Sequence, residues 1–257
     1  MSRVRLASIL VLVAAMPAVA DDCPGPDKPI ATDRPDVTNS SLVVPKGSFQ
    51  NENGINFSVS GRDRGLDATN SRLRLGVAQC LEMFVDLPTR FFALRGAAAD
   101  GFTNVAPGLK WQISPDPGKF DLSATFGVAL PTGSKTLNGP GAQPYVQFPW
   151  SYELSRGWGL SGMLTLFSRP SDPVNRLTTE ATFVVEKEIL DGINLFTEYV
   201  GDFSDHGRSR QFINSGAAWQ VTTTQQLDFH VAFGLNSNSP EVIVGLGYSF
   251  RRDGLFK

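Results

Sequence analysis

The feature that most constrains the fold is an alternation of apolar and polar residues that recurs along most of the chain. In the segment 120–130, Phe, Leu, Ala, Phe, Val and Leu occupy every second position. The segments 177–186, 227–235 and 242–250 repeat this rhythm. Period-two alternation of this length indicates half-buried β-strands, and helical spacing is not sustained anywhere after the first twenty residues. The pattern therefore predicts an all-β protein.

Alternating segments recur about twelve times, close to the ten-residue segments expected of membrane barrels. They begin near Ser48, Ser71, Leu81, Phe102, Lys119, Pro144, Trp158, Arg176, Gly192, Arg210, Gln226 and Pro240. Short connections at 114–118, 155–157, 190–192 and 222–225 alternate with mostly longer ones at 61–70, 131–143, 168–175 and 204–209. Short turns at one end and long loops at the other are typical of an outer-membrane barrel with its short turns in the periplasm.

A soluble sandwich also alternates, so the positions of the aromatic residues matter. Six aromatic residues with apolar-face parity fall near the short-turn end: Trp111, Tyr152, Trp158, Trp219, Tyr248 and Phe250. A membrane interface gathers Trp and Tyr at one height, whereas a sandwich core has no reason to do so. We therefore predict a transmembrane antiparallel up-and-down β-barrel of about twelve strands over residues 48–250, with a sandwich as the alternative.

The N-terminus has the pattern of a secretory signal peptide. Arg3 and Arg5 precede an apolar run, and "AVA" at 18–20 offers small residues for cleavage. The run is too short to span a membrane comfortably, and no later apolar run is long enough for a membrane helix. We expect residues 1–20 to be removed near Ala20. The mature chain then has a periplasmic lead-in at 21–47, the barrel at 48–250 and a periplasmic tail at 251–257, in the outer membrane.

Charge and motifs limit the chemistry. The net charge is −2, from 23 basic and 25 acidic residues, so no nucleic-acid footprint is visible. No Cys/His cluster has metal-ligand spacing, and no nucleophile elbow or phosphate loop occurs. The loop pair Asp205–His206 is read as solvated rather than catalytic. We predict a protein without cofactor or catalytic residues, not an enzyme and monomeric, whose partners are outer-membrane lipid and the insertion machinery that recognises a final-strand aromatic residue.

The polar face of the strands would line the barrel interior. By parity it collects Glu52, Arg72, Arg74, Lys110, Asp121, Glu153, Glu180, Glu186, Glu198, Asp228 and His230. One interpretation is a charged lumen that selects and orients a solute. The other is a self-paired polar core that closes the barrel. About twelve strands lie between the size that side chains fill and the size that leaves a channel, so the strand number leaves both open.

The lead-in 21–47 is rich in Pro, Asp and Ser. It is either a disordered periplasmic segment or a plug in the lumen mouth, with Arg34 meeting the inner carboxylates. Cys23 and Cys80 are the only cysteines, and both are expected at the oxidising periplasmic side. We therefore expect them to form a disulfide that pins the lead-in to the barrel rim.

Several short stretches resemble a family of bacterial outer-membrane proteins filed under the meta pathway of phenol degradation. They are "TDRPDVT" at 32–38, "VPKGSFQ" at 44–50, "PGLKW" at 107–111, "LPTGS" at 130–134 and the block 226–250. The resemblance implies a signal peptide, a single barrel and the passage of small molecules, including aromatic or hydrophobic ones, and the "TDRP" stretch favours a fixed role for the lead-in. Cys80 and the tail after Phe250 depart from the family pattern. The alternative function is a structural barrel with a closed lumen that acts through its extracellular loops.

Overall fold

The computed structural model describes residues 23–256 except 97, 99, 116–118, 140, 169–176 and 205–206. The expected signal peptide 1–20, its cleavage near Ala20 and the Asp205–His206 pair lie outside the described residues. Within them, no helix is long and apolar enough to cross a bilayer.

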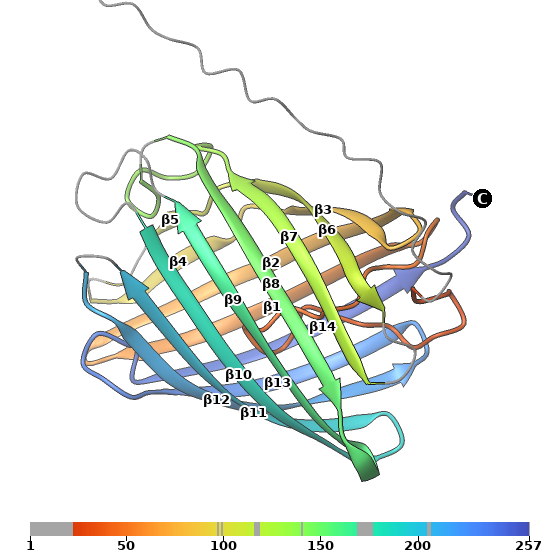
Figure 1. The fold of residues 1–257 in the computed structure, drawn as a ribbon. Coiled ribbons are helices and arrows are strands. Elements are labelled where there is room, and N and C mark those ends of the chain that lie inside the picture. Colours follow the sequence, from red (N-terminus) through yellow and green to blue (C-terminus); the bar gives the residue numbers. More distant parts are fainter. Residues whose placement is uncertain are drawn as a thin grey trace, which may run out of the picture.

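The described chain forms one antiparallel sheet that closes into a barrel (Figure 1). Its strands are β1 (Phe49–Ser60), β2 (Asp63–Ala78), β3 (Leu81–Asp86), β4 (Arg90–Arg95), β5 (Gly101–Phe102), β6 (Ala106–Pro115), β7 (Phe120–Ala129), β8 (Gln143–Glu153), β9 (Trp158–Ser168), β10 (Leu177–Leu190), β11 (Ile193–Ser204), β12 (Arg210–Thr222), β13 (Gln225–Gly234) and β14 (Val242–Arg252). β1 pairs with β2 on one side and with β14 on the other, which closes the sheet. Two strands of the barrel are each divided into two segments. One consists of β3 and β4 and the other of β5 and β6, so the barrel has the predicted twelve strands.

Burial is inverted relative to a soluble protein. The large outward side chains Phe126, Phe183 and Phe229 are 52%, 45% and 44% exposed, whereas inward Thr125 and Thr165 are fully buried. An apolar outer band around a polar interior is the pattern of a membrane barrel. It rules out the sandwich, whose apolar faces would meet each other. The aromatic residues Tyr152, Trp158, Trp219 and Tyr248 are exposed near the short turns, as predicted.

The expectation of a long connection at 61–70 is wrong. β2 begins at Asp63, and only the turn Gly61–Arg62 joins it to β1. Gly61 has φ +58°, a conformation that glycine adopts without strain. The charged residues at 62–67 are typical of a loop. The segment is nevertheless a strand, in which Gly65 and Asp67 alternate with Arg64 and Leu66, and all four pair in register with β1. At the other end of the chain, β14 continues two residues past the expected end at Phe250.

The barrel wall is interrupted between β2 and the divided strand β3–β4. β2 pairs with β3 through Arg72–Ala78 and with β4 through Arg64–Ala68, so the regular pairing skips residues 69–71. Pro88 lies in the gap between β3 and β4, where its missing N–H ends the ladder. A single backbone bond, from Leu87 N to Ser71 O at 2.9 Å, bridges the opening.

Candidate functional site

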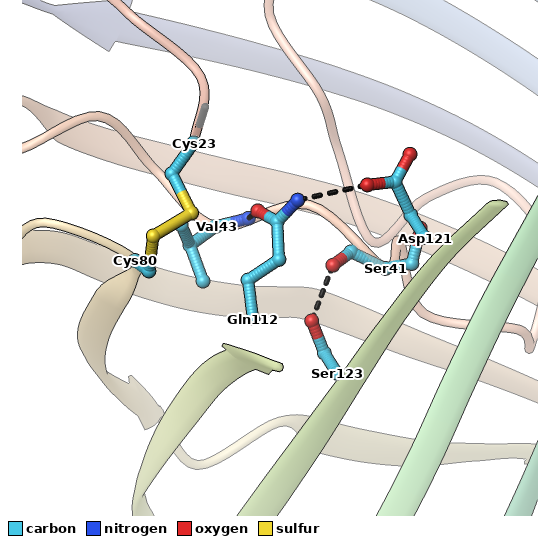
Figure 2. Close-up of a disulfide and its surroundings, with 7 residues drawn as sticks. All are labelled: Cys23, Ser41, Val43, Cys80, Gln112, Asp121 and Ser123. Carbon is cyan, nitrogen blue, oxygen red and sulfur yellow. Dashed lines mark hydrogen bonds between the residues drawn. A yellow bond between two sulfur atoms is a disulfide. The ribbon is translucent and has the colours of Figure 1, made fainter. Parts of the chain in front are cut away.

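The lead-in lies inside the barrel rather than trailing from it. In Figure 1 it enters, red to orange, at the end where the C-terminus lies. We call residues 23–47 the plug. Its first residue is joined to the β2–β3 turn by the disulfide Cys23–Cys80, with a Cα–Cα distance of 5.3 Å (Figure 2). Its last residues meet the end of β2, where Gly47 N donates to Gly76 O at 2.8 Å. The plug is therefore an arch with both feet on one hairpin.

The first arm of the arch is also held by the C-terminal strand. The Arg251 guanidinium donates to the carbonyl oxygens of Pro26, Lys28 and Pro29 at 2.9, 2.9 and 3.3 Å. Ile30 N donates to Thr223 O in a neighbouring turn at 2.8 Å. These contacts place the arm across the short-turn rim.

The arch packs against a cluster of buried charges on β1, β2, β3 and β6, which we call the cationic wall. Asp33 of the plug forms ion pairs with Lys110 at 2.8 Å, Arg72 at 2.8 Å and Arg74 at 3.5 Å. Burial alone would raise the pKa of Asp33, but the charges of Arg74, Lys110 and Arg72 outweigh it and hold this pKa well below its ordinary value. Asp33 is therefore ionised and held by three cations from two strands, β2 and β6.

The same cations also hold the wall and the plug backbone together. Arg74 bridges Glu52 at 2.8 Å and Glu82 at 2.9 Å. It donates to the plug carbonyls of Ala31 and Leu42 at 3.0 and 3.1 Å, as Lys110 does to Ser40 O at 3.0 Å. Arg72 pairs with Asp86 at 2.6 Å. Removing one partner from such a buried cluster leaves an uncompensated charge, which costs about 3–5 kcal/mol.

The opposite contact of the arch is made to β8, β10 and β11 and differs in kind. We call β10 and β11, with inward Glu180, Glu186 and Glu198, the acidic wall. Glu198 is fully buried and accepts hydrogen bonds from the plug amides of Val37 and Thr38 at 2.9 and 2.8 Å. It also accepts one from the Thr38 hydroxyl at 2.8 Å and one from Asn214 at 3.1 Å. Among the described residues, no Lys or Arg forms an ion pair with it.

Two further contacts hold the arch to this side. The Thr38 hydroxyl meets that of Thr182 on β10 at 2.5 Å, and Asn39 donates to Gln147 on β8 at 3.0 Å. Asp36 of the plug faces the acidic wall. Burial raises the pKa of Asp36 well above its ordinary value, and the negative charges of Glu198, Glu186 and Asp33 raise it further.

Arg34 of the plug meets an inner carboxylate, that of Asp228, at 3.1 Å. A side chain added at either Gly54 or Gly247, which pair across β1 and β14, would overlap its guanidinium, so this pair of glycines forms the space that Arg34 occupies. Beyond it, the ring of His230 lies between Asn214 at 3.0 Å and Asn56 at 3.2 Å. His230 is thus part of an inward amide network rather than a catalytic pair.

The remaining predicted residues also face inward. Asp121 accepts from Gln112 at 2.9 Å (Figure 2), and Glu180 accepts from Thr165 at 3.4 Å. Glu153 and Glu186 line a void of about 1040 Å³. Sequence reasoning missed Asp33, Glu82 and Asp86. Extending the alternation through the irregular third segment would have placed Glu82 and Asp86 inward, and Asp33 lies in the quoted "TDRP" stretch.

Two voids lie beside the plug among the described residues. The larger, about 1040 Å³, lies toward the short-turn rim between the arch and the inner face of β7–β14. The smaller, about 290 Å³, lies behind the interruption of the wall and is lined by Ser71, Leu87 and Thr89. Arg34, Asp36 and Asn39 border both voids. The tip of the arch is therefore what separates them.

Comparison with known proteins places this barrel in a family. The family model described as "Putative MetA-pathway of phenol degradation" matches residues 32–251. The chain belongs to this family. No curated protein sequence matches it. Fold and family together make it an outer-membrane protein.

Solved structures share the fold at low sequence identity. An outer membrane channel from Pseudomonas putida F1 superposes with a TM-score of 0.62 at 12% identity, covering 82% of this chain and 97% of that one. The NanC porin gives 0.57 at 8% identity, covering 79% and 98%. The KdgM porin in complex with disordered oligogalacturonate gives 0.55 at 7% identity, also covering 79% and 98%.

Proposed function

We propose that the protein is a passive outer-membrane channel for small molecules, closed at rest by its own plug and open when the tip of the plug leaves the acidic wall. The observation that carries this proposal is the pair of voids separated only by the tip of the arch. The larger void has the size of a small-molecule site, which spans about 300–1,000 Å³. The relatives in the structural comparison are channels and porins, and no catalytic role is proposed for any residue.

The lining of the voids supports a class of solute. Both contain acidic and basic side chains as well as Ser, Thr and Asn, and the larger void also contains Gln. Such walls replace part of the hydration of a polar group, whereas a purely apolar molecule gains little from them. The solute is therefore a small molecule with at least one hydrogen-bonding group, and a hydroxylated aromatic compound has such a group.

Cleavage near Ala20 would leave Cys23 close to the new N-terminus.

The alternative, a structural barrel with a permanently closed lumen, makes a different prediction. Planar-bilayer recording of the full-length protein should show brief, small openings, and a variant with residues 24–45 replaced by a short Gly/Ser linker should conduct steadily. Liposome swelling should then admit larger uncharged solutes through the variant than through the wild type. Silence of both proteins, with heat-modifiable mobility intact, would support the structural barrel.

A further inference from the structure

The outer surface carries a cluster of arginines at the long-loop end of β1, β2 and β4, which we call the arginine patch: Arg62, Arg64, Arg90 and Arg95. Arg64 has the parity of the outward Leu66, because buried Gly65 and Asp67 take the inner positions. Arg95 lies opposite Arg64 in the β2–β4 register, and Arg90 lies opposite Ala68 on the same outer face. Arg62 is exposed in the turn between β1 and β2.

The charges of the arginine patch are incompletely compensated. Like charges directly opposite each other across two strands destabilise the pairing, and Arg64 and Arg95 are such a pair. Arg90 pairs with Asp100 at 2.9 Å, and Arg64 donates only to the carbonyls of Gly61 and Asp63. Among the described residues, Arg62 and Arg95 form no ion pair. The acids at this end are Asp63, Asp100 and Glu241, whose N–H donates to Val59 O beside Arg64. The patch thus presents free donors to an anion.

The surface beneath Arg62, Arg64 and Arg95 is apolar and faces lipid, and Arg90 lies on the bilayer side of it. Phe57, Leu66 and Phe92 form a row across β1, β2 and β4. Phe92 and Phe102 flank the Arg90 guanidinium, with ring centroids 4.7 and 5.3 Å away. A cationic rim above exposed aromatic rings matches a molecule with an anionic head and acyl chains.

The arrangement is specific to one sector of the barrel. At the same end, the outward residues of β9 and β10 are uncharged, namely Leu166, Ser168, Leu177 and Thr179, and Phe203 and Phe233 are outward on β11 and β13. The arginine sector is also the weakest part of the wall, because β5 pairs with β4 through only two residue pairs. A ligand that bridges the β1–β2 turn and the end of β4 would therefore fasten the sector beside the interruption.

We propose that the arginine patch binds the phosphate groups of a phosphorylated glycolipid of the outer leaflet, with lipid A as the simplest example. Guanidinium groups bind phosphate through paired, charge-assisted hydrogen bonds, and three of them from two chain segments converge here. The acyl chains then lie over Phe57, Leu66 and Phe92. The long-loop end of the barrel faces the leaflet that holds such lipids, so the location and the chemistry agree.

The test uses the purified full-length protein in detergent, with doubly phosphorylated lipid A and its dephosphorylated form as probes. Lipid A should raise the temperature at which the folded gel band disappears, and dephosphorylated lipid should not. R62Q/R64Q/R95Q should bind lipid A on the order of tenfold more weakly or worse, since several charge-assisted bonds are lost. R252Q is the matched control, because Arg252 is exposed and outward at the opposite, short-turn end.

Each other outcome overturns the proposal. Equal binding of the dephosphorylated lipid, or unchanged binding by the triple variant, would show that the arginines do not recognise phosphate. Full competition by inorganic phosphate at the same concentration would assign the patch to free anions. Equal loss in R252Q would show a nonspecific charge effect. If the triple variant does not reach the folded band, R95Q alone carries the test, because Arg95 is exposed and its replacement removes no ion pair among the described residues.

Discussion

The plug touches two walls of the same barrel, and the contacts differ in their chemistry. On the cationic wall, Asp33 is held by three cations, and the disulfide and the Gly47–Gly76 bond lie at the same side. On the acidic wall, Glu198 is held by N–H and O–H donors alone. The larger void lies beneath the second contact. The comparison indicates that the plug is fixed on one side and releasable on the other.

The largest effect should come from breaking the cationic wall. R74Q leaves Glu52 and Glu82 buried beside a neutral side chain, and we expect it to lower the free energy of unfolding by about 3–5 kcal/mol. The heat-dependent loss of the folded gel band measures this change. R210Q is the control, because Arg210 pairs with Asp202 but is 56% exposed, and its loss should cost about 1 kcal/mol or less. Similar losses in the two variants would remove the distinction between a buried anchor and a surface ion pair.

A smaller effect should follow from weakening the acidic wall. E198Q keeps one acceptor oxygen but loses the charge that binds Val37 N–H and Thr38 N–H, which should weaken the contact by about 1–3 kcal/mol. We expect more frequent openings in bilayer recordings while the folded gel band stays close to wild type. The contradicting outcome is that R74Q opens the channel while its barrel stays folded and E198Q does not open it. The plug would then be released from the cationic wall and not from the acidic wall.

Two aspartates of the plug, Asp33 and Asp36, predict opposite responses to pH. The pKa of Asp33 is lowered, so its anchor is complete at neutral pH and is lost only in strong acid. The pKa of Asp36 is raised, so the plugged state holds a proton that a released plug would lose above the ordinary value of 3.8. Raising the pH toward the raised pKa therefore weakens the plug at the acidic wall.

Bilayer recordings from mildly acidic to mildly alkaline pH should show openings that become more frequent as the pH rises. D36N should flatten this dependence, since its amide does not titrate. The charged groups that face Asp36 are Glu198, Glu186 and Asp33, and all three are kept in D36N. A wild-type channel that opens more often at lower pH would contradict the assignment.

The smallest effect on the barrel should come from removing the disulfide. C23S/C80S frees the first foot of the arch, while Arg251 and the second foot still hold it. We expect an unchanged folded gel band and faster thermolysin cleavage within residues 24–32, since Pro29 blocks trypsin after Lys28. The single variant C80S, with Cys23 alkylated, is the control for added bulk. A large loss of barrel stability would mean that the disulfide supports the strands and not only the plug.

Much of the barrel structure could be predicted from the sequence, because side chains alternate between the two faces of a strand with a strict two-residue period. Knowing that Phe183 is outward assigns Glu180, Thr182 and Glu186 inward, and the aromatic residues near the short turns favour a barrel over a sandwich. The failure at 61–70 has a physical origin, since strands at the long-loop rim extend into water and carry charges there. Local sequence patterns thus predict the membrane-spanning part of each strand better than the residue at which the strand begins or ends.

The partners of the plug could not be predicted in the same way. Arg34 and Asp228 are 194 positions apart and meet only because the arch enters the lumen and the sheet closes. The sequence places seven acidic residues on the inner face, and any of them could pair with Arg34. Asp228 is its partner because Gly54 and Gly247 leave space for the Arg34 guanidinium there. Whether the lumen is filled or open likewise depends on the height that the arch reaches, which no local pattern encodes.

The most direct test of a plug that is fixed on the cationic wall and released from the acidic wall is a covalent lock on the second contact. T38C/T182C replaces two hydroxyls that touch, so a disulfide can form between the plug and β10. Bilayer recordings of the oxidised variant should show no openings, and adding reductant should restore them. The wild type, whose disulfide is on the other wall, should conduct alike in both conditions. Wild-type openings in the oxidised variant would contradict the account.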